Sequence, residues 1–109
     1  MPVTTFDPCA WIGARAPEAP ERLVARVLEV FAEHPTWVAL PAADALLSAG
    51  ESLLVEVLPG DSGAARENAL DLLASDACVT WAFEAAADAP ATLTARAIEA
   101  MRRIAAAIR

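Results

Sequence analysis

A chain of 109 residues is long enough for one domain whose hydrophobic core needs neither a metal nor a disulfide. It is 57% hydrophobic and has a formal net charge of −7, so it lacks the overall basic surface that nucleic-acid-binding proteins present. No stretch reaches the ~20 apolar residues of a membrane span, and "MPVTTFDPC" at the N-terminus lacks the regions of a secretory signal. We therefore expect no nucleic acid or membrane partner, and a cytoplasmic location with Cys9 and Cys78 reduced.

The first 19 residues differ in character from the rest of the chain. They show no periodic pattern, and their three prolines and one glycine predict an irregular N-terminal arm over 1–19. We expect residues 20–109 to form a single helical domain. Its first helix is predicted over 20–34, because apolar residues recur with helical spacing, Pro20 suits a first helical position and His34 precedes a proline.

The central segments are less clear. "TWVAL" (36–40) is rich in strand-favouring residues but too short to decide. Residues 41–58 fit one helix, although Gly50 in its middle weakens that prediction by about 1 kcal/mol relative to Ala, and a short helix followed by a strand is the alternative. Residues 64–88 and 93–108 are predicted as two further helices.

The number of helices indicates the fold class. About four helices with short connections predict an all-α compact bundle. The alternative is a small α/β domain in which "TWVAL", "LLVEVL" and "CVTWAF" are strands. Because "FEAAAD" is poor strand material, we favour the bundle and leave helix or strand open for 36–58 and 77–83. The last helix carries an apolar side formed by Leu93, Ala97, Ile98, Met101, Ile104 and Ile108.

Two carboxylates stand in the most apolar predicted helix. Helical spacing places Asp76, Thr80 and Glu84 on one face. A carboxylate removed from water and left unpaired is a candidate acid, base or ligand. The structural alternative is that Asp76 lies at a helix boundary and pairs with a hydroxyl, a backbone amide or an arginine such as Arg22 or Arg96. The candidate ligand-binding residues are Asp76, Thr80, Trp81, Glu84 and His34.

The amino-acid sequence contains no recognisable catalytic or metal-binding motif. His34 is the one histidine, the two cysteines lack C-x-x-C spacing, and no Glu-x-x-His pair occurs. No glycine-rich phosphate loop occurs either. We therefore predict no metal, no cofactor and no catalytic residue, and leave open whether the chain is an enzyme while favouring that it is not.

Aromatic residues outside the strong helices suggest a binding surface. Phe6, Trp11 and Ile12 lie in the predicted arm and Trp37 follows the first helix, and tryptophan is enriched at interfaces. These four residues are the candidate interface, unless the arm folds back and they cap the chain's own core. A homodimer is the expected form, because two-fold dimers are the commonest oligomers, and another protein is a further candidate partner.

The last helix offers a secondary surface because of its charge. Its arginines either complement the helix dipole or contact the acidic body of another copy; they are Arg96, Arg102, Arg103 and Arg109. We thus expect a small acidic helical protein that self-associates as a protein-interaction module. The alternative is a small-molecule-binding helical domain, or a minimal enzyme, with a pocket around Asp76 and Glu84.

Overall fold

A computed structural model describes residues 5–57, 65–88 and 93–108, with the side chains of 65–67 and 93–96 excepted. Within these ranges the protein contains helices and no strand, which confirms the all-α prediction. Five α-helices take the place of the expected four or so. The elements are α1 (Pro8–Arg15), α2 (Glu21–Glu33), the 3-10 helix η1 (Pro35–Ala39), α3 (Ala42–Val57), α4 (Ala65–Ala86) and α5 (Leu93–Ile108).

The additional helix lies where an irregular arm was predicted. Residues 1–4 of that arm lie outside the described residues, but Pro8–Arg15 form α1, so the prediction of an irregular segment is wrong there. The Asp7 side chain caps the helix by accepting a hydrogen bond from the backbone N–H of Ala10 at 3.1 Å. Pro8 occupies the first helical turn, where its missing N–H costs nothing. A proline taken as a sign of irregular structure is in fact part of a helix start.

The alternative α/β fold is not formed. "TWVA" lies in η1, "LLVEV" lies in the second half of α3, and "CVTWAF" lies inside α4. The open choice between helix and strand is thus resolved as helix over 42–57 and 77–83. α3 continues through Gly50, where the absence of a side chain leaves room for α4.

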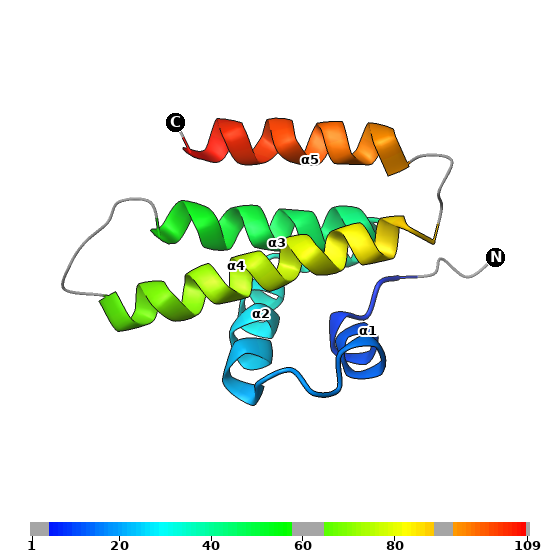
Figure 1. Cartoon of the computed structure of the whole chain (residues 1–109). Helices are drawn as coiled ribbons and strands as arrows, with labels where there is room; N and C mark the ends of the chain where they lie inside the picture. The colour runs from blue at the N-terminus through cyan, green and yellow to red at the C-terminus, as the bar shows by residue number, and fades with distance from the viewer. Residues whose placement is uncertain (1–4, 58–64, 89–92, 109) are drawn as a thin grey trace.

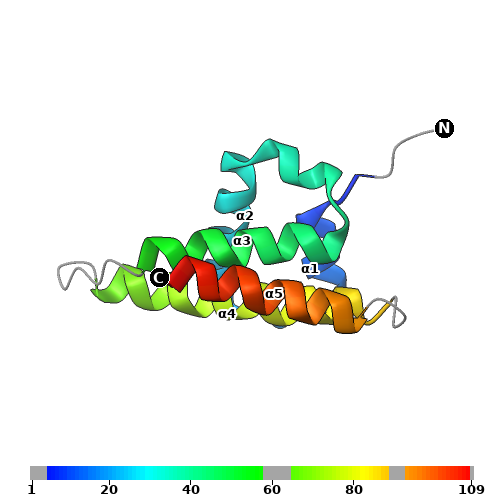
Figure 2. The ribbon, with the colours of Figure 1, turned by 90° about the horizontal axis from the view of Figure 1, so that it is seen from above.

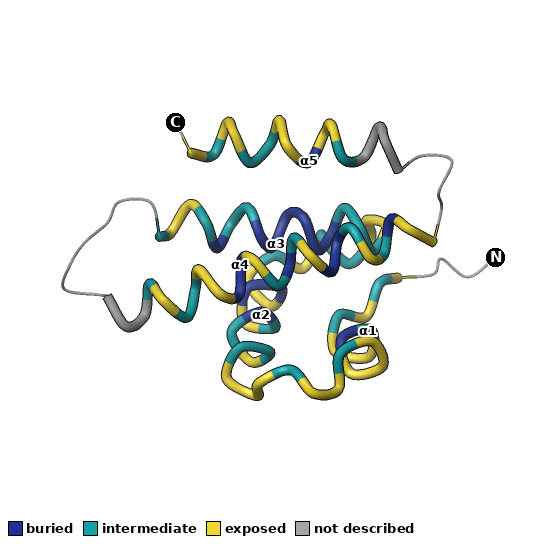
Figure 3. The backbone as a smooth tube through the Cα atoms, in the orientation of Figure 1, coloured by how far each residue is buried: buried dark blue, intermediate teal, exposed yellow. Residues whose placement is uncertain are grey.

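Three long helices form the body of the molecule. Figure 1 shows α3, α4 and α5 running along one another, each antiparallel to the one before it in the chain. In the view from above in Figure 2, α5 lies over α3 and α4, and it contacts both helices. In Figure 1, α2 crosses below them and α1 lies beyond α2. Figure 3 shows that the buried residues concentrate on α3 and on the sides of α2 and α4 that meet it, so α3 is the centre of the core.

The closest helix packing is between α3 and α4 at Gly50. A Cβ atom there would lie 3.0 Å from a methyl of Val79, 3.2 Å from the backbone oxygen of Ser75 and 3.3 Å from Cβ of Cys78. The absence of that Cβ lets the two backbones approach. The approach brings the buried Ser75 hydroxyl to the Gly50 carbonyl, to which it donates a hydrogen bond at 2.7 Å. This bond satisfies a buried polar group that would otherwise be costly.

None of the helices in the described part of the chain combines the length and hydrophobicity that crossing a membrane would require.

Candidate interaction surface

The structure does not bring the five predicted ligand-binding residues together in one place. Asp76, Thr80 and Glu84 share one face of α4 as their spacing predicted, but that face is exposed to solvent. Trp81 is buried on the side of the helix that faces the core, and His34 ends α2. Within the single chain, Asp76 is therefore not a desolvated carboxylate. Of the arginines considered as its partner, Arg22 is exposed on α2, and the side chain of Arg96 lies outside the described residues.

His34 lies away from these residues, in a depression between η1, α3 and α5. Its Nδ1–H donates to the backbone oxygen of Val30 at 3.0 Å, and its ring stacks on Trp37 with centroids 3.9 Å apart. These rings line an open cavity of about 390 Å³. Across it, Arg103 of α5 donates to Glu51 at 3.2 Å and to the Ser48 hydroxyl at 3.0 Å. Because Arg103 and Glu51 neutralise each other, this pair leaves no net charge there that would select a charged ligand.

The predicted interface residues of the arm fold back onto the chain's own core. Ile12 is buried, and Phe6 packs against Phe31 with ring centroids 5.8 Å apart. Trp37 also packs against Phe31, in an edge-on arrangement with ring centroids 5.8 Å apart. The backbone N–H of Phe6 donates to the carbonyl of Val38 at 2.8 Å, which fixes the arm against η1. The alternative stated for these residues, that they cap the core, therefore describes the single chain.

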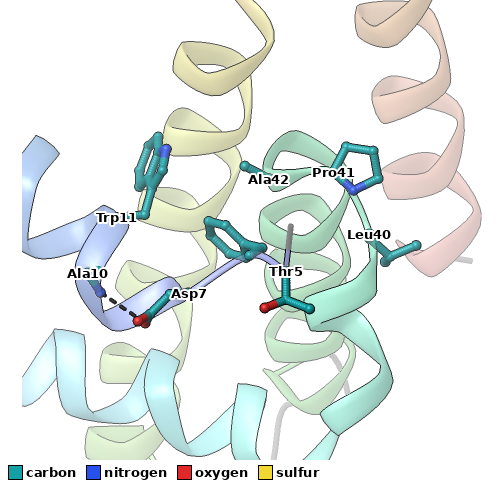
Figure 4. A pocket seen from close by; sticks show the side chains of 8 residues that line it. Thr5, Asp7, Ala10, Trp11, Leu40, Pro41 and Ala42 are labelled. Carbon is teal, nitrogen blue, oxygen red and sulfur yellow. Dashed lines mark hydrogen bonds between the residues drawn. The ribbon is translucent and has the colours of Figure 1, made fainter. Parts of the chain in front are cut away.

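A shallow apolar cavity remains where the arm meets the start of α3. It has a volume of about 500 Å³, and Figure 4 shows Trp11 of α1 on one side of it and Leu40 and Pro41 on the other. The guanidinium of Arg15 lies 5.0 Å from the Trp11 ring centre. Phe6 packs edge-on to Trp11 at 6.4 Å, so the arm supplies part of the lining.

The last helix leaves much of its apolar side uncovered. Among the side chains of α5 described over 97–108, Ala100 is buried and Ala97 and Ile104 are half-buried. Ile98, Met101 and Ile108 are 56%, 69% and 56% exposed. Figure 3 shows this helix as mostly exposed and intermediate. The apolar side predicted from the sequence exists, but only part of it faces the core.

The apolar side of α5 stays partly exposed because Arg103 anchors this helix to α3. Its bonds to Glu51 and Ser48 turn the Arg103 side of α5 toward α3. Side chains two positions apart on a helix point in nearly opposite directions. Met101 is therefore turned outward when Arg103 is held inward.

The neighbouring helix exposes large aliphatic side chains as well. Leu72 and Leu73 of α4 are 51% and 59% exposed, beside Asp76 on the same helix. α4 and α5 are in contact and run antiparallel (Figure 1). Leu73 lines a depression of about 230 Å³ with Pro20, Arg22 and Leu23, on the side of α4 that faces α2. We name the exposed aliphatic residues of the last helix the α5 surface; they are Ile98, Met101 and Ile108. Helical periodicity alone did not reveal this surface, because it identifies apolar sides and not which of them a neighbour covers.

The described residues show no cluster suited to metal binding or nucleophilic chemistry. No three of their His, Cys, Asp or Glu side chains are placed to hold a metal ion together. Cys9 and Cys78 are free thiols, and burial raises the pKa of Cys78 to about 12, which keeps this thiol protonated and unreactive. No protein-family model matches the chain, and comparison with curated proteins and with solved structures finds no similar protein.

Proposed function

We propose that this protein is a small protein-interaction module that self-associates through the α5 surface. The observation that carries the proposal is the exposure of Ile98, Met101 and Ile108 on a helix whose described side chains include one buried residue, Ala100. Burying an aliphatic side chain of this size contributes about 1.5–3 kcal/mol. Covering several of them therefore offers a driving force for association, and exposed apolar groups of this kind are typical of binding surfaces.

The local charge is compatible with a second copy of the chain as the occupant. Beside the exposed aliphatic residues of α5, Arg102 is paired with Glu99 at 3.1 Å, so these two groups add no net charge to the surface. Because the chain as a whole is acidic, we expect two copies to approach each other with less repulsion at this surface than at the acidic parts of the molecule.

We also place this association in the cytoplasm. Both cysteines are free thiols, and Cys9 is exposed. Reducing compartments keep such thiols unpaired.

Sedimentation velocity over a range of protein concentrations tests the proposal. We expect the wild-type protein to dimerise and Met101→Glu to raise the dimer dissociation constant roughly tenfold or more, because a charge would enter the apolar interface. The matched control is Val55→Glu, which makes the same substitution at an aliphatic residue of α3 that is 49% exposed and lies outside the surface. A monomeric wild-type protein, or equal effects of the two substitutions, would contradict the proposal.

A further inference from the structure

We infer that the depression between η1, α3 and α5 binds a short linear zwitterion, an amino acid whose amine and carboxylate lie at opposite ends of an aliphatic chain. The carboxylate would bind Arg103 and the ammonium would bind Glu56. This inference goes beyond the proposed function and does not depend on it, because Arg103 is held toward α3 while the α5 surface faces solvent.

The depression is built on the polar side of the central helix. Residues at intervals of three or four positions share one side of a helix, and such a set of α3 residues lines the depression: Ser48, Glu51, Ser52, Val55 and Glu56. The stacked rings of His34 and Trp37 and the side chain of Arg103 from α5 also line it. The volume of about 390 Å³ lies in the range of small-molecule sites. Residues from separate elements therefore converge on a space of ligand size.

Arg103 provides the donor end of the site. Its bonds to Glu51 and Ser48 use two of the five N–H groups that a guanidinium carries. The pairing with Glu51 leaves room for a second carboxylate, since Arg26 of the same protein pairs with three carboxylates at once. The planar guanidinium matches the geometry of a carboxylate. We therefore place the carboxylate of the ligand on the remaining N–H groups of Arg103.

Glu56 provides the acceptor end of the site. Its side chain is 51% exposed, and Arg26 binds its Oε2 at 2.6 Å, which leaves Oε1 for a ligand. Arg26 also pairs with Asp71 and Glu29, so one positive charge is shared among three negative charges. The surroundings of Glu56 therefore attract a cation, and we place the ammonium group of the ligand there.

The separation of the two ends decides the length of the ligand. Glu56 lies five residues after Glu51, the partner of Arg103, which corresponds to about 7.5 Å along α3. The amine and carboxylate of an α-amino acid are attached to the same carbon and do not span that distance. An extended 6-aminohexanoate does, and its methylene groups would contact Val55 and the ring of Trp37.

An NMR titration of the isotope-labelled full chain with 6-aminohexanoate tests the inference. We expect saturable shifts of the Trp37 indole and Arg103 Nε–H signals, with a dissociation constant of about 1–10 mM. Hexylamine and hexanoate each lack one charged group, and glycine lacks the length, so we expect each to bind roughly tenfold more weakly. Similar affinities for all these probes, or no saturable shift with 6-aminohexanoate up to about 50 mM, would overturn the inference.

Two substitutions of carboxylates that pair with Arg26 test the acceptor end. Glu56→Gln removes the negative charge from the site, and we expect it to weaken 6-aminohexanoate binding roughly tenfold, to the level of hexanoate. Glu29→Gln is the matched control, because Glu29 pairs with the same arginine but is not among the residues that line the depression. Its affinity should stay within about twofold of the wild type. Equal effects of the two substitutions would show that the ammonium group does not bind Glu56.

Ser52→Leu tests the location of the site without removing a charge. The larger side chain would fill part of the depression, while the ion pairs of Arg103 and Glu56 keep their partners. We expect this variant to lose binding of 6-aminohexanoate at least tenfold and to keep a melting temperature within about 3 °C of the wild type. Binding that survives this substitution unchanged would place the ligand elsewhere and contradict the inference.

Discussion

Arg26 of α2 holds the carboxylate of Asp71 on α4 with two hydrogen bonds, from Nε to Oδ1 at 2.7 Å and from Nη2 to Oδ2 at 3.3 Å. The same guanidinium donates to Glu56 of α3 at 2.6 Å and to Glu29 of its own helix at 3.1 Å. One arginine therefore joins three helices. The hydrogen bond to Asp71 and the surrounding negative charges raise the pKa of Arg26, so it stays charged at all relevant pH values.

Replacing this arginine should destabilise the fold. In Arg26→Met, the largely buried carboxylate of Asp71 loses its partner, and we expect the free energy of unfolding to fall by about 1–3 kcal/mol. Glu29→Gln is the control, because it removes an exposed partner of the same arginine and should change stability by less than about 0.5 kcal/mol. Urea unfolding measures both, and equal effects would show that Asp71 does not depend on the arginine.

Gly50→Ala should destabilise the protein although alanine favours helices. The new Cβ would lie 3.2 Å from the backbone oxygen of Ser75, which cannot move without shifting α4. We expect a net loss of about 1–3 kcal/mol in thermal or urea unfolding, larger than the gain from helix propensity. Gly13→Ala in α1 is the matched control. No atom lies within 4 Å of its added Cβ, so stability should rise by about 0.5–1 kcal/mol.

Cys78 should make stability depend on alkaline pH. Its pKa is raised from 9.0 to about 12 by burial, so above pH 9 the unfolded chain loses a proton that the folded chain retains. The free energy of unfolding should therefore be constant with respect to this thiol below pH 9 and fall by about 1.4 kcal/mol per pH unit above it.

The composition of the chain makes it easy to assign this alkaline pH dependence to Cys78. The chain contains no lysine and no tyrosine, so few other side chains titrate between pH 9 and 11. Urea unfolding at several pH values in this range gives the slope. In Cys78→Ala the slope should disappear whatever the change in overall stability, and a slope that persists in this variant would show that another group is responsible.

The stability that the Asp7 cap contributes to α1 should be measurable with two substitutions of Asp7. Asp7→Ala removes the acceptor for the Ala10 N–H and should cost about 1 kcal/mol, whereas Asp7→Ser retains a capping oxygen and should cost less. Trp11 lies in the same helix and reports on it by fluorescence. If the two variants unfold alike, the side-chain cap does not stabilise α1.

The sequence predicted the long helices because their apolar spacing is local information. Residues 93–108 were assigned the bounds that α5 has. The short helix α1 was missed because its start depends on one side chain, Asp7, placed before a proline. The face shared by Asp76, Thr80 and Glu84 was predicted correctly, but not its exposure, because that depends on which side of α4 packs against α3.

The exposed side of α5 depends on contacts between distant parts of the chain. Arg103 reaches Ser48 and Glu51, which lie on another helix far along the sequence. Helical periodicity contains no information about such pairs. The same holds for Arg26 and Asp71, whose pairing no spacing rule indicated.

The sparse burial of α5 also has a consequence for local unfolding. Ala100 is the one buried residue of α5 among the described side chains, whereas Val27, Val30 and Phe31 of α2 are all buried. We therefore expect α5 to separate from α3 and α4 at a lower free energy than α2 separates from the body. The backbone amides of α5 should then exchange with solvent faster than those of α2 and α3. Because the proposed association would cover the same helix, exchange in α5 should slow as the protein concentration rises, which would couple the local folding of one helix to the presence of a second molecule.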